Sequence, residues 1–386
     1  MTNSPCIVIP GIQGSSLANC YPLAPQTSWS TSQVVETSFV APDFDALALD
    51  DAGEADLTEN VVTLAAGLLG AAYGPLVAGL RGRSGVPAYL FPYDWRYSNV
   101  VSAQRLVHVV TRLRKKPLTS IGGWDGSFDF VVHSMGGLVL RAFLAEWRAA
   151  MAEPLPVRQV VFIATPHLGS LDAVEALISG EAVLLGGRKE LRKLSRSFPS
   201  VYELLPRFDN AVVRDGAPLD LFDERNWQAN VTGAAQAPDD DYGVVQRHLT
   251  AARTMLNDLP DPTRVLPVDD LLVIYGADPN STLSSVTVSS PAGKPQNWYD
   301  FDNAQKGPGD DIVPVVSAAL ADVSSVELRT EDVSYFHPIQ RGMASLDLHA
   351  FLPALDEVAT IAGRFLGGTR GSDLLPAGLP RGRFHV

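Results

Sequence analysis

The sequence predicts an α/β protein with a mostly parallel central sheet flanked by helices. Three observations support this: short apolar runs alternate with helical patterns, the runs are nearly continuous in apolar residues, and one of them leads directly into a serine followed by a helix. Alternating strands and helices are typical of a parallel sheet wrapped by helices. Strands covered on both faces also lack the in–out alternation of a half-exposed sheet.

The expected strands occupy residues 6–10, 86–92, 128–133, 157–164, 271–276 and 324–329. Helices fit residues 100–115, 135–151, 242–257 and 355–366, where apolar residues recur every three or four positions. Residues 61–80 are uncharged but rich in Ala and Gly. We interpret them as a buried or lid helix rather than a membrane span, and we expect Pro75 to break that helix.

Two long stretches interrupt the alternation and divide the chain. We expect a core made of residues 1–30, 86–170 and 268–368, a lid-like insertion with a helix at 31–85, and a helical cap insertion at 171–267. Insertions of this size between sheet elements commonly carry lids or substrate pockets. Residues 369–386 are rich in Gly, Pro and Arg and are expected to be a linker-like tail.

Composition excludes several classes of protein. The 386 residues are 46% apolar and carry a net charge of −13, which argues against disorder and against a nucleic-acid-binding surface. Cys6 and Cys20 are too few for a disulfide scaffold or a cysteine metal cluster, and we expect free thiols, no metal and no cofactor. The N-terminus lacks a basic and apolar leader, which favours a cytoplasmic location.

Ser134 is the candidate nucleophile. It follows the apolar strand at 128–133 and precedes a helical pattern, which is the context of a strand–turn–helix nucleophile elbow. Gly136 supplies one of the small neighbours that this turn needs, whereas Val132 stands where a second glycine is usual. A serine that only caps the helix is the alternative interpretation. His133 adjoins the serine too closely to act as its base.

A serine nucleophile needs a histidine base and an orienting acid, which follow it in the order acid, then histidine. Asp310, in the turn GDDIVP, fits the acid best, with Asp311 and Asp278 as alternatives. His349 lies just before the last predicted helix, where the geometry requires a base. His337 is the alternative base.

Two backbone N–H groups should form the oxyanion hole. Met135, directly after the serine, supplies the first. The second is expected from the Gly-rich turn PGIQGS after the first strand, with Ile12 the first choice and Gln13 the second. Gln13, His133 and His167 are expected to line the substrate pocket.

The blocks PGIQGSSL, YDWR, HSMGG, ATPHLGS and GDDIVP, in this order, resemble the lecithin:cholesterol acyltransferase-like family of α/β hydrolases, the group of lysosomal phospholipase A and phospholipid:diacylglycerol acyltransferase. The resemblance implies the α/β-hydrolase fold. It also implies a catalytic triad of Ser134, Asp310 and His349. The oxyanion hole would be formed by the backbone amides of Ile12 and Met135. The chain departs from the family at Val132 and at Asp311, where glycine is frequent.

These patterns predict a serine-dependent acyl-ester hydrolase or acyltransferase that works through an acyl-enzyme on Ser134. Its substrate would be a lipid or another acyl ester, with transient contact between the lid and a lipid surface. The alternative is a catalytically inactive hydrolase fold that binds a lipid or a partner. The substrate, the choice of water or an alcohol as acceptor, and the oligomeric state stay open.

Overall fold

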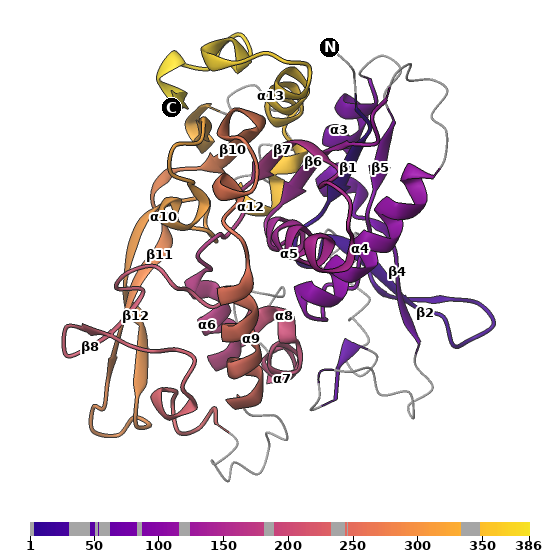
Figure 1. Ribbon diagram of the computed structural model, residues 1–386. Coiled ribbons are helices and arrows are strands. Elements are labelled where there is room, and N and C mark those ends of the chain that lie inside the picture. Colours follow the sequence, from indigo (N-terminus) through magenta and orange to yellow (C-terminus); the bar gives the residue numbers. More distant parts are fainter. Residues whose placement is uncertain are drawn as a thin grey trace.

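The computed structural model describes residues 4–30, 47–50, 53, 62–82, 87–115, 124–180, 189–232, 244, 246–332 and 348–386. A seven-stranded sheet forms its centre, in the order β14-β13-β10-β7-β6-β1-β5 (Figure 1). All pairs are parallel except β13 with β14. The strands are β1 (Cys6–Ile9), β5 (Ala88–Leu90), β6 (Phe128–His133), β7 (Val157–Ile163), β10 (Leu271–Gly276), β13 (Ser325–Leu328) and β14 (Phe384–His385).

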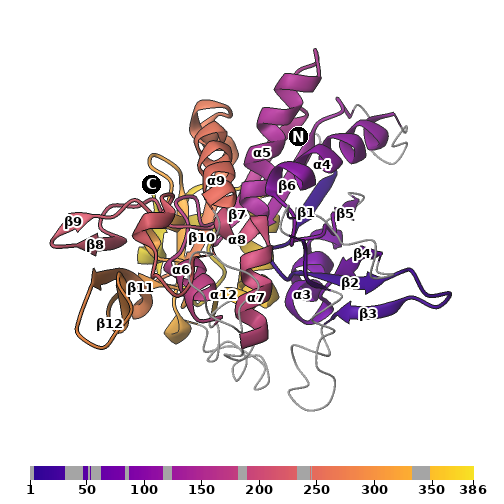
Figure 2. The same cartoon turned by 90° about the horizontal axis from the view of Figure 1, so that it is seen from below.

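Helices cover both faces of this sheet. Figure 2 shows α4 (Asn99–Arg114) and α5 (Gly136–Ala150) on one side of β1 and β6, and α3 (Gly70–Arg81) on the other. The helix α13 (Asp356–Leu366) packs beside α3. Apolar side chains of the strands alternate between two buried clusters, one under each layer of helices. The predicted α/β architecture is therefore confirmed. Each of the six predicted strands begins and ends within two residues of its predicted bounds, and β14 is a seventh strand that was not predicted.

The N-terminal region carries a small antiparallel sheet that the sequence analysis did not predict. Its strands are β2 (Ser15–Asn19), β3 (Gln26–Trp29) and β4 (Thr63–Leu68). The predicted helix at 61–80 is thus wrong in its first half, which pairs with β2 as a strand. Pro75 lies inside α3 instead of breaking it. A proline removes one helical hydrogen bond, and burial of Tyr73, Leu76, Val77 and Leu80 compensates for that loss.

The cap region contains strands as well as helices, which corrects the expectation of a helical cap. Its helices are α6 (Leu171–Ile178), α7 (Lys189–Ser197), α8 (Pro199–Tyr202) and α9 (Gln246–Asp258). Two short strands, β8 (Val212–Arg214) and β9 (Ala217–Pro218), join a four-stranded sheet with β11 (Asp278–Ser289) and β12 (Trp298–Gly309). The long β11–β12 hairpin therefore leaves the expected core and pairs with the cap.

The C-terminal residues are part of the fold and not a linker-like tail. β14 extends the central sheet along β13, and Leu374 is fully buried. Arg383 explains this placement, because its guanidinium lies 2.9 Å from the Glu327 carboxylate of β13 and 2.7 Å from that of Asp332. The Gly and Arg content that suggested a linker thus serves turns and ion pairs.

The remaining helices are short: α10 (Val315–Ala318), α12 (Leu348–Phe351), and the 3₁₀ turns at Glu224–Asn226, Pro262–Arg264, Val268–Asp270, Thr330–Asp332, Leu352–Ala354, Gly371–Leu374 and Arg381–Arg383. Within the described residues, no helix combines the length and the apolar character that crossing a bilayer requires.

Candidate active site

Ser134 occupies a sharp turn between β6 and α5. Its backbone φ is +52°, a left-handed conformation that is uncommon outside glycine and marks a strained turn. The Ser134 N–H donates to the Ile163 carbonyl of the next strand at 2.8 Å. A Cβ at Gly136 would stand 2.5 Å from the Pro10 carbonyl oxygen, so only glycine fits there. Val132 is accommodated in the sheet with its side chain fully buried.

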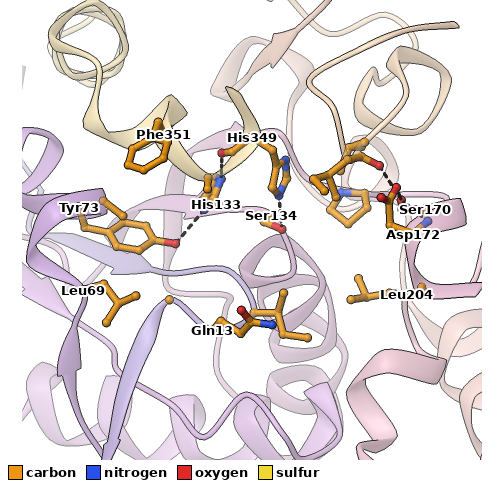
Figure 3. Close-up of a pocket in the computed structure, with 18 of the residues that line it drawn as sticks. Gln13, Leu69, Tyr73, His133, Ser134, Ser170, Asp172, Leu204, His349 and Phe351 are labelled. Atoms are coloured by element: carbon orange, nitrogen blue, oxygen red, sulfur yellow. Dashed lines mark hydrogen bonds between the residues drawn. The ribbon is translucent and has the colours of Figure 1, made fainter. Parts of the chain in front are cut away.

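Three candidate residues form a continuous hydrogen-bonded chain. His349 Nδ1 lies 2.8 Å from Asp310 Oδ2, and His349 Nε2 lies 2.8 Å from Ser134 Oγ (Figure 3). All three side chains are at least nine-tenths buried. Because an ionised carboxylate only accepts hydrogen bonds, this arrangement assigns the imidazole hydrogen to Nδ1 and leaves Nε2 to accept the serine proton.

The structure separates the three acid candidates. Asp310 also accepts the N–H groups of Ile312 and Val313 at 3.2 and 2.7 Å, which fixes its carboxylate. Asp311 instead accepts the Leu348 N–H at 3.0 Å and so holds the start of α12. Its φ of +80° belongs to the left-handed region that favours glycine. Asp278 accepts hydrogen bonds from the Thr330 N–H and the Thr330 hydroxyl.

His349 lies in the short helix α12, and not in a loop as its position before the last helix suggested. Its backbone N–H donates to the Asp310 carbonyl at 3.0 Å. The alternative base, His337, lies outside the described residues. His385 stands in β14, with Nε2 3.4 Å from Glu327.

The loop after β1 faces the serine. Ile12 and Gln13 line the pocket beside Ser134, and a Cβ at Gly11 would stand only 2.7 Å from that of Ser134. Trp29 Nε1 donates to the Gln13 carbonyl at 2.9 Å, which holds the loop in place. Met135 follows the serine and begins the turn into α5.

A pocket of about 180 Å³ lies over Ser134 and is walled mainly by apolar groups. In Figure 3 Leu69, Tyr73 and Phe351 stand on one side of the serine, and Leu204 and Asp172 on the other. Gln13 and His133 are among the residues that line this pocket. Among the described residues, no group of three or more His, Cys, Asp or Glu side chains is placed to hold a metal ion.

The expectation that His167 lines the pocket is wrong. Its neighbour Pro166 does so, while the His167 ring points into the core and meets Phe162 edge-on at a centroid distance of 4.9 Å. Burial, reinforced by the charge of Arg141, holds the pKa of His167 well below its ordinary value. His167 follows β7 by four residues and is buried, which strand spacing alone did not reveal.

Tyr73 and Asp172 are pocket residues that were not singled out from the sequence. Tyr73 reaches the site from α3, which is distant in sequence. Asp172 follows Ser170, the N-cap of α6, and burial raises the pKa of Asp172 to about 7. The Ser170 hydroxyl lies 2.9 Å from Asp172 Oδ2 and 2.5 Å from the Ile312 carbonyl oxygen. The pattern Ser-x-Asp before an apolar helix predicts a cap but carries no sign of a pocket.

Comparison with known proteins agrees with this architecture. The lecithin:cholesterol acyltransferase family model matches residues 83–257. A chain of the Tle4–Tli4 complex has a similar structure, with a TM-score of 0.58 and 16% identity, covering 93% of this chain and 98% of that chain. This likeness shows a shared fold over nearly the whole length.

Two lipase structures are more distant. Lipase BlEst2 of Bacillus licheniformis, in mature form, has a TM-score of 0.33 and 12% identity, covering 85% of this chain and 84% of that chain. Lipase 1 from Pelosinus fermentans has a TM-score of 0.32 and 14% identity, covering 90% and 99%. A search of the curated proteins finds no significant match. The chain thus has the sheet topology and the serine turn of the α/β-hydrolase fold, and its residues 83–257 are similar to the lecithin:cholesterol acyltransferase family.

Proposed function

We propose that the chain is a serine-dependent hydrolase or acyltransferase of carboxylic esters, with Ser134 as nucleophile, His349 as base and Asp310 as orienting acid. The observation that carries this proposal is the unbroken chain of two 2.8 Å hydrogen bonds from Asp310 through His349 to Ser134, at the floor of an apolar pocket. A nucleophile, a base and an orienting group in mutual hydrogen-bond reach constitute the geometric requirement for such chemistry.

In the first half-reaction, His349 Nε2 takes the Ser134 proton while Oγ attacks the ester carbonyl carbon. The imidazolium that forms keeps its Nδ1–H on the Asp310 carboxylate, which stabilises the new positive charge. The proton then passes from Nε2 to the leaving alcohol oxygen as its bond to the acyl carbon breaks. The products are a free alcohol and an acyl ester of Ser134.

The tetrahedral oxygen needs two donors that are in place before the reaction. We assign these to the backbone N–H of Met135 and to that of Ile12, with Gln13 as the alternative for the second. The close approach of the Gly11 backbone to Ser134 supports this assignment, because it brings the loop after β1 next to the reacting carbon.

In the second half-reaction, His349 activates the acceptor by taking its proton. Water then releases a carboxylic acid, and an alcohol instead produces a new ester, so the same site serves hydrolysis and acyl transfer. The apolar pocket walls favour an acyl chain. Together with the family match, they support a lipid ester as substrate.

We further propose that β4, which lies in the expected lid-like insertion at 31–85, forms a lid that contacts lipid surfaces together with β2 and β3, two paired strands from the segment 1–30 that was expected to belong to the core. The seven-stranded sheet forms the core and the α6–α9 region the cap. Apolar side chains of this lid lie open to solvent: Tyr21 is 59% exposed, Leu23 fully exposed and Leu64 52% exposed. Exposed apolar groups that gather in one region are typical of a surface that meets a membrane or a partner. Trp29, at the end of β3, lines the pocket and so connects this lid with the pocket.

The test is hydrolysis of p-nitrophenyl butyrate by the wild-type chain and by Ser134→Ala. We expect the variant to lose a factor of about 10⁴–10⁶ in kcat. Unchanged turnover in the variant would remove Ser134 from the mechanism. A folded wild-type chain with no turnover on short, acylglycerol or phospholipid esters would instead favour a binding module built on a hydrolase fold.

A further inference from the structure

The Tyr73 hydroxyl lies where three separate segments of the chain meet. It comes from α3 and is almost fully buried. The Gly11 N–H, in the loop after β1, lies 2.8 Å from the Tyr73 oxygen. His133 Nδ1, at the end of β6, lies 2.8 Å from the same oxygen. On its other side, His133 Nε2 lies 3.1 Å from the backbone carbonyl oxygen of His349.

Donor counting fixes the direction of all three hydrogen bonds. The His349 carbonyl can only accept, so His133 Nε2 carries the hydrogen. In a neutral imidazole the other nitrogen, Nδ1, is then an acceptor, and the Tyr73 O–H must donate to it. The Tyr73 oxygen accepts in turn from the Gly11 N–H. Each donor is used once and each acceptor receives a hydrogen, so the series of hydrogen bonds from the Gly11 N–H to the His349 carbonyl is complete.

This series of hydrogen bonds requires a neutral His133 imidazole. Burial, reinforced by the nearby His349 ring, holds the pKa of His133 well below its ordinary value. The two rings lie at a centroid distance of 5.0 Å. A second positive charge there would oppose the imidazolium that forms on His349 during the proposed reaction. The His133 ring is therefore suited to hold the backbone of His349 and does not compete with His349 for the Ser134 proton.

We propose that Tyr73 and His133 are positioning residues that fix the backbone of His349 and the Gly11 loop relative to Ser134. This inference rests on the proposed function. The same chain occupies the Gly11 N–H, which leaves the second oxyanion donor to the residues after it. Since Tyr73 and Leu69 also line the pocket, α3 is linked to the oxyanion loop directly and to the backbone of the base through His133.

Tyr73→Phe tests the chain with the loss of one oxygen atom. The variant leaves the Gly11 N–H and His133 Nδ1 without their partner, while the ring that fills the wall remains. We expect kcat for p-nitrophenyl butyrate to fall about 10- to 100-fold, because displacement of reacting groups by about 1 Å has effects of this size. KM should change less than about twofold, since the wall is kept.

Tyr299→Phe is the matched control. Tyr299 is equally buried, and its hydroxyl donates to the Asn226 carbonyl at 3.1 Å in the sheet of the cap region. It should lose comparable thermal stability and keep its kcat. A Tyr73→Phe protein that is as stable as Tyr299→Phe and keeps kcat within threefold of wild type would overturn the positioning role.

Two substitutions of His133 separate its hydrogen bond with His349 from its hydrogen bond with Tyr73. Gln places its amide N–H near the position of Nε2 and can still donate to the His349 carbonyl. Asn places its amide near Nδ1 and keeps only the contact with Tyr73. We expect His133→Gln to retain at least fivefold more kcat than His133→Asn, and the acid limb of the kcat/KM profile to move only in His133→Asn.

Equal kcat and unshifted pH profiles in the two His133 variants would overturn the link to His349, and they serve as the test if Tyr73→Phe does not fold. These outcomes differ from a failure of the proposed function. That failure appears as turnover that survives Ser134→Ala, or as no turnover in the wild-type chain.

Discussion

Asp310 and His349 are joined twice, by side chain and by backbone. The Asp310 carboxylate lies 2.8 Å from His349 Nδ1, and the Asp310 carbonyl accepts the His349 N–H at 3.0 Å. The β11–β12 hairpin delivers Asp310 at its end, while α12 delivers the histidine. The double connection fixes both the position and the rotation of the imidazole, which a single side-chain contact would leave free.

The first prediction compares the two neighbouring acids. Asp310→Asn replaces an ionised acceptor, so the imidazole loses its preferred tautomer and the support for its positive charge. We expect kcat for p-nitrophenyl butyrate to fall about 10³- to 10⁴-fold. Asp311→Asn keeps an oxygen acceptor for the Leu348 N–H and should lose less than about tenfold. The opposite ranking would assign the acid role to Asp311.

The second prediction concerns Gly11. A methyl group there would stand 2.7 Å from Ser134 Cβ and 3.2 Å from Ser134 Oγ. Gly11→Ala should therefore push the loop from the serine and lower kcat/KM by about 10²-fold. Gly363→Ala is the control, because its added methyl meets nothing within 4 Å on α13. Initial rates and melting temperatures of both variants separate loss of activity from loss of folding. Full activity in Gly11→Ala would contradict a close, rigid loop.

The third prediction links Asp172 to pH. Burial raises its pKa to about 7 from an ordinary value of 3.8. Above pH 4 the unfolded chain has released this proton while the folded chain still holds it, so this group makes the folded state less stable as pH rises towards 7. Asp172→Asn removes the effect. Relative to wild type, the variant should therefore gain about 2–3 kcal/mol in unfolding free energy between pH 5 and pH 8.

Urea unfolding of both proteins at the two pH values measures this gain. The difference between the proteins cancels the contributions of other buried groups whose pKa burial shifts, Glu203, His133 and His167. A difference that stays constant with pH would mean that Asp172 is ionised throughout.

The fourth prediction addresses the lid. Leu23→Asp places a charge at the fully exposed tip of the β2–β3 hairpin. If this tip enters a lipid surface, turnover of phosphatidylcholine vesicles should fall about tenfold, the equivalent of one buried leucine side chain. Turnover of soluble p-nitrophenyl butyrate should not change. Val101→Asp, at a half-exposed site on α4, is the control, and an equal effect of both variants on vesicles would argue against a lid contact.

Continuous burial made the central strands predictable. Apolar runs such as those of β1, β6 and β10 are buried at every residue, and the helices between them show clear spacing. The β11–β12 hairpin was missed because its polar strands are mostly exposed or half-buried and lack a continuous apolar run. The strand β4 was missed because its apolar composition is compatible with a helix.

The residues of the candidate site likewise comprise some that a sequence pattern indicates and some that only the packing reveals. Ser134, Asp310 and His349, which the structure brings together, could be proposed from the sequence because each lies in a motif with a required place in the chain order. The partnership of Tyr73 with His133 was not found, because the two lie 60 residues apart and meet only through the packing of α3 against the sheet. His167 was misplaced because strand spacing does not determine which way a residue after the strand turns.

The central claim is that Ser134 is a nucleophile activated by His349. Treatment with a fluorophosphonate, followed by peptide mass spectrometry, tests it most directly, because the probe forms a covalent bond to an activated serine with loss of fluoride. We predict one adduct, on the peptide that contains Ser134, which disappears in Ser134→Ala and forms far more slowly in His349→Ala. A folded wild-type protein without an adduct, or with the adduct on another residue, would contradict it.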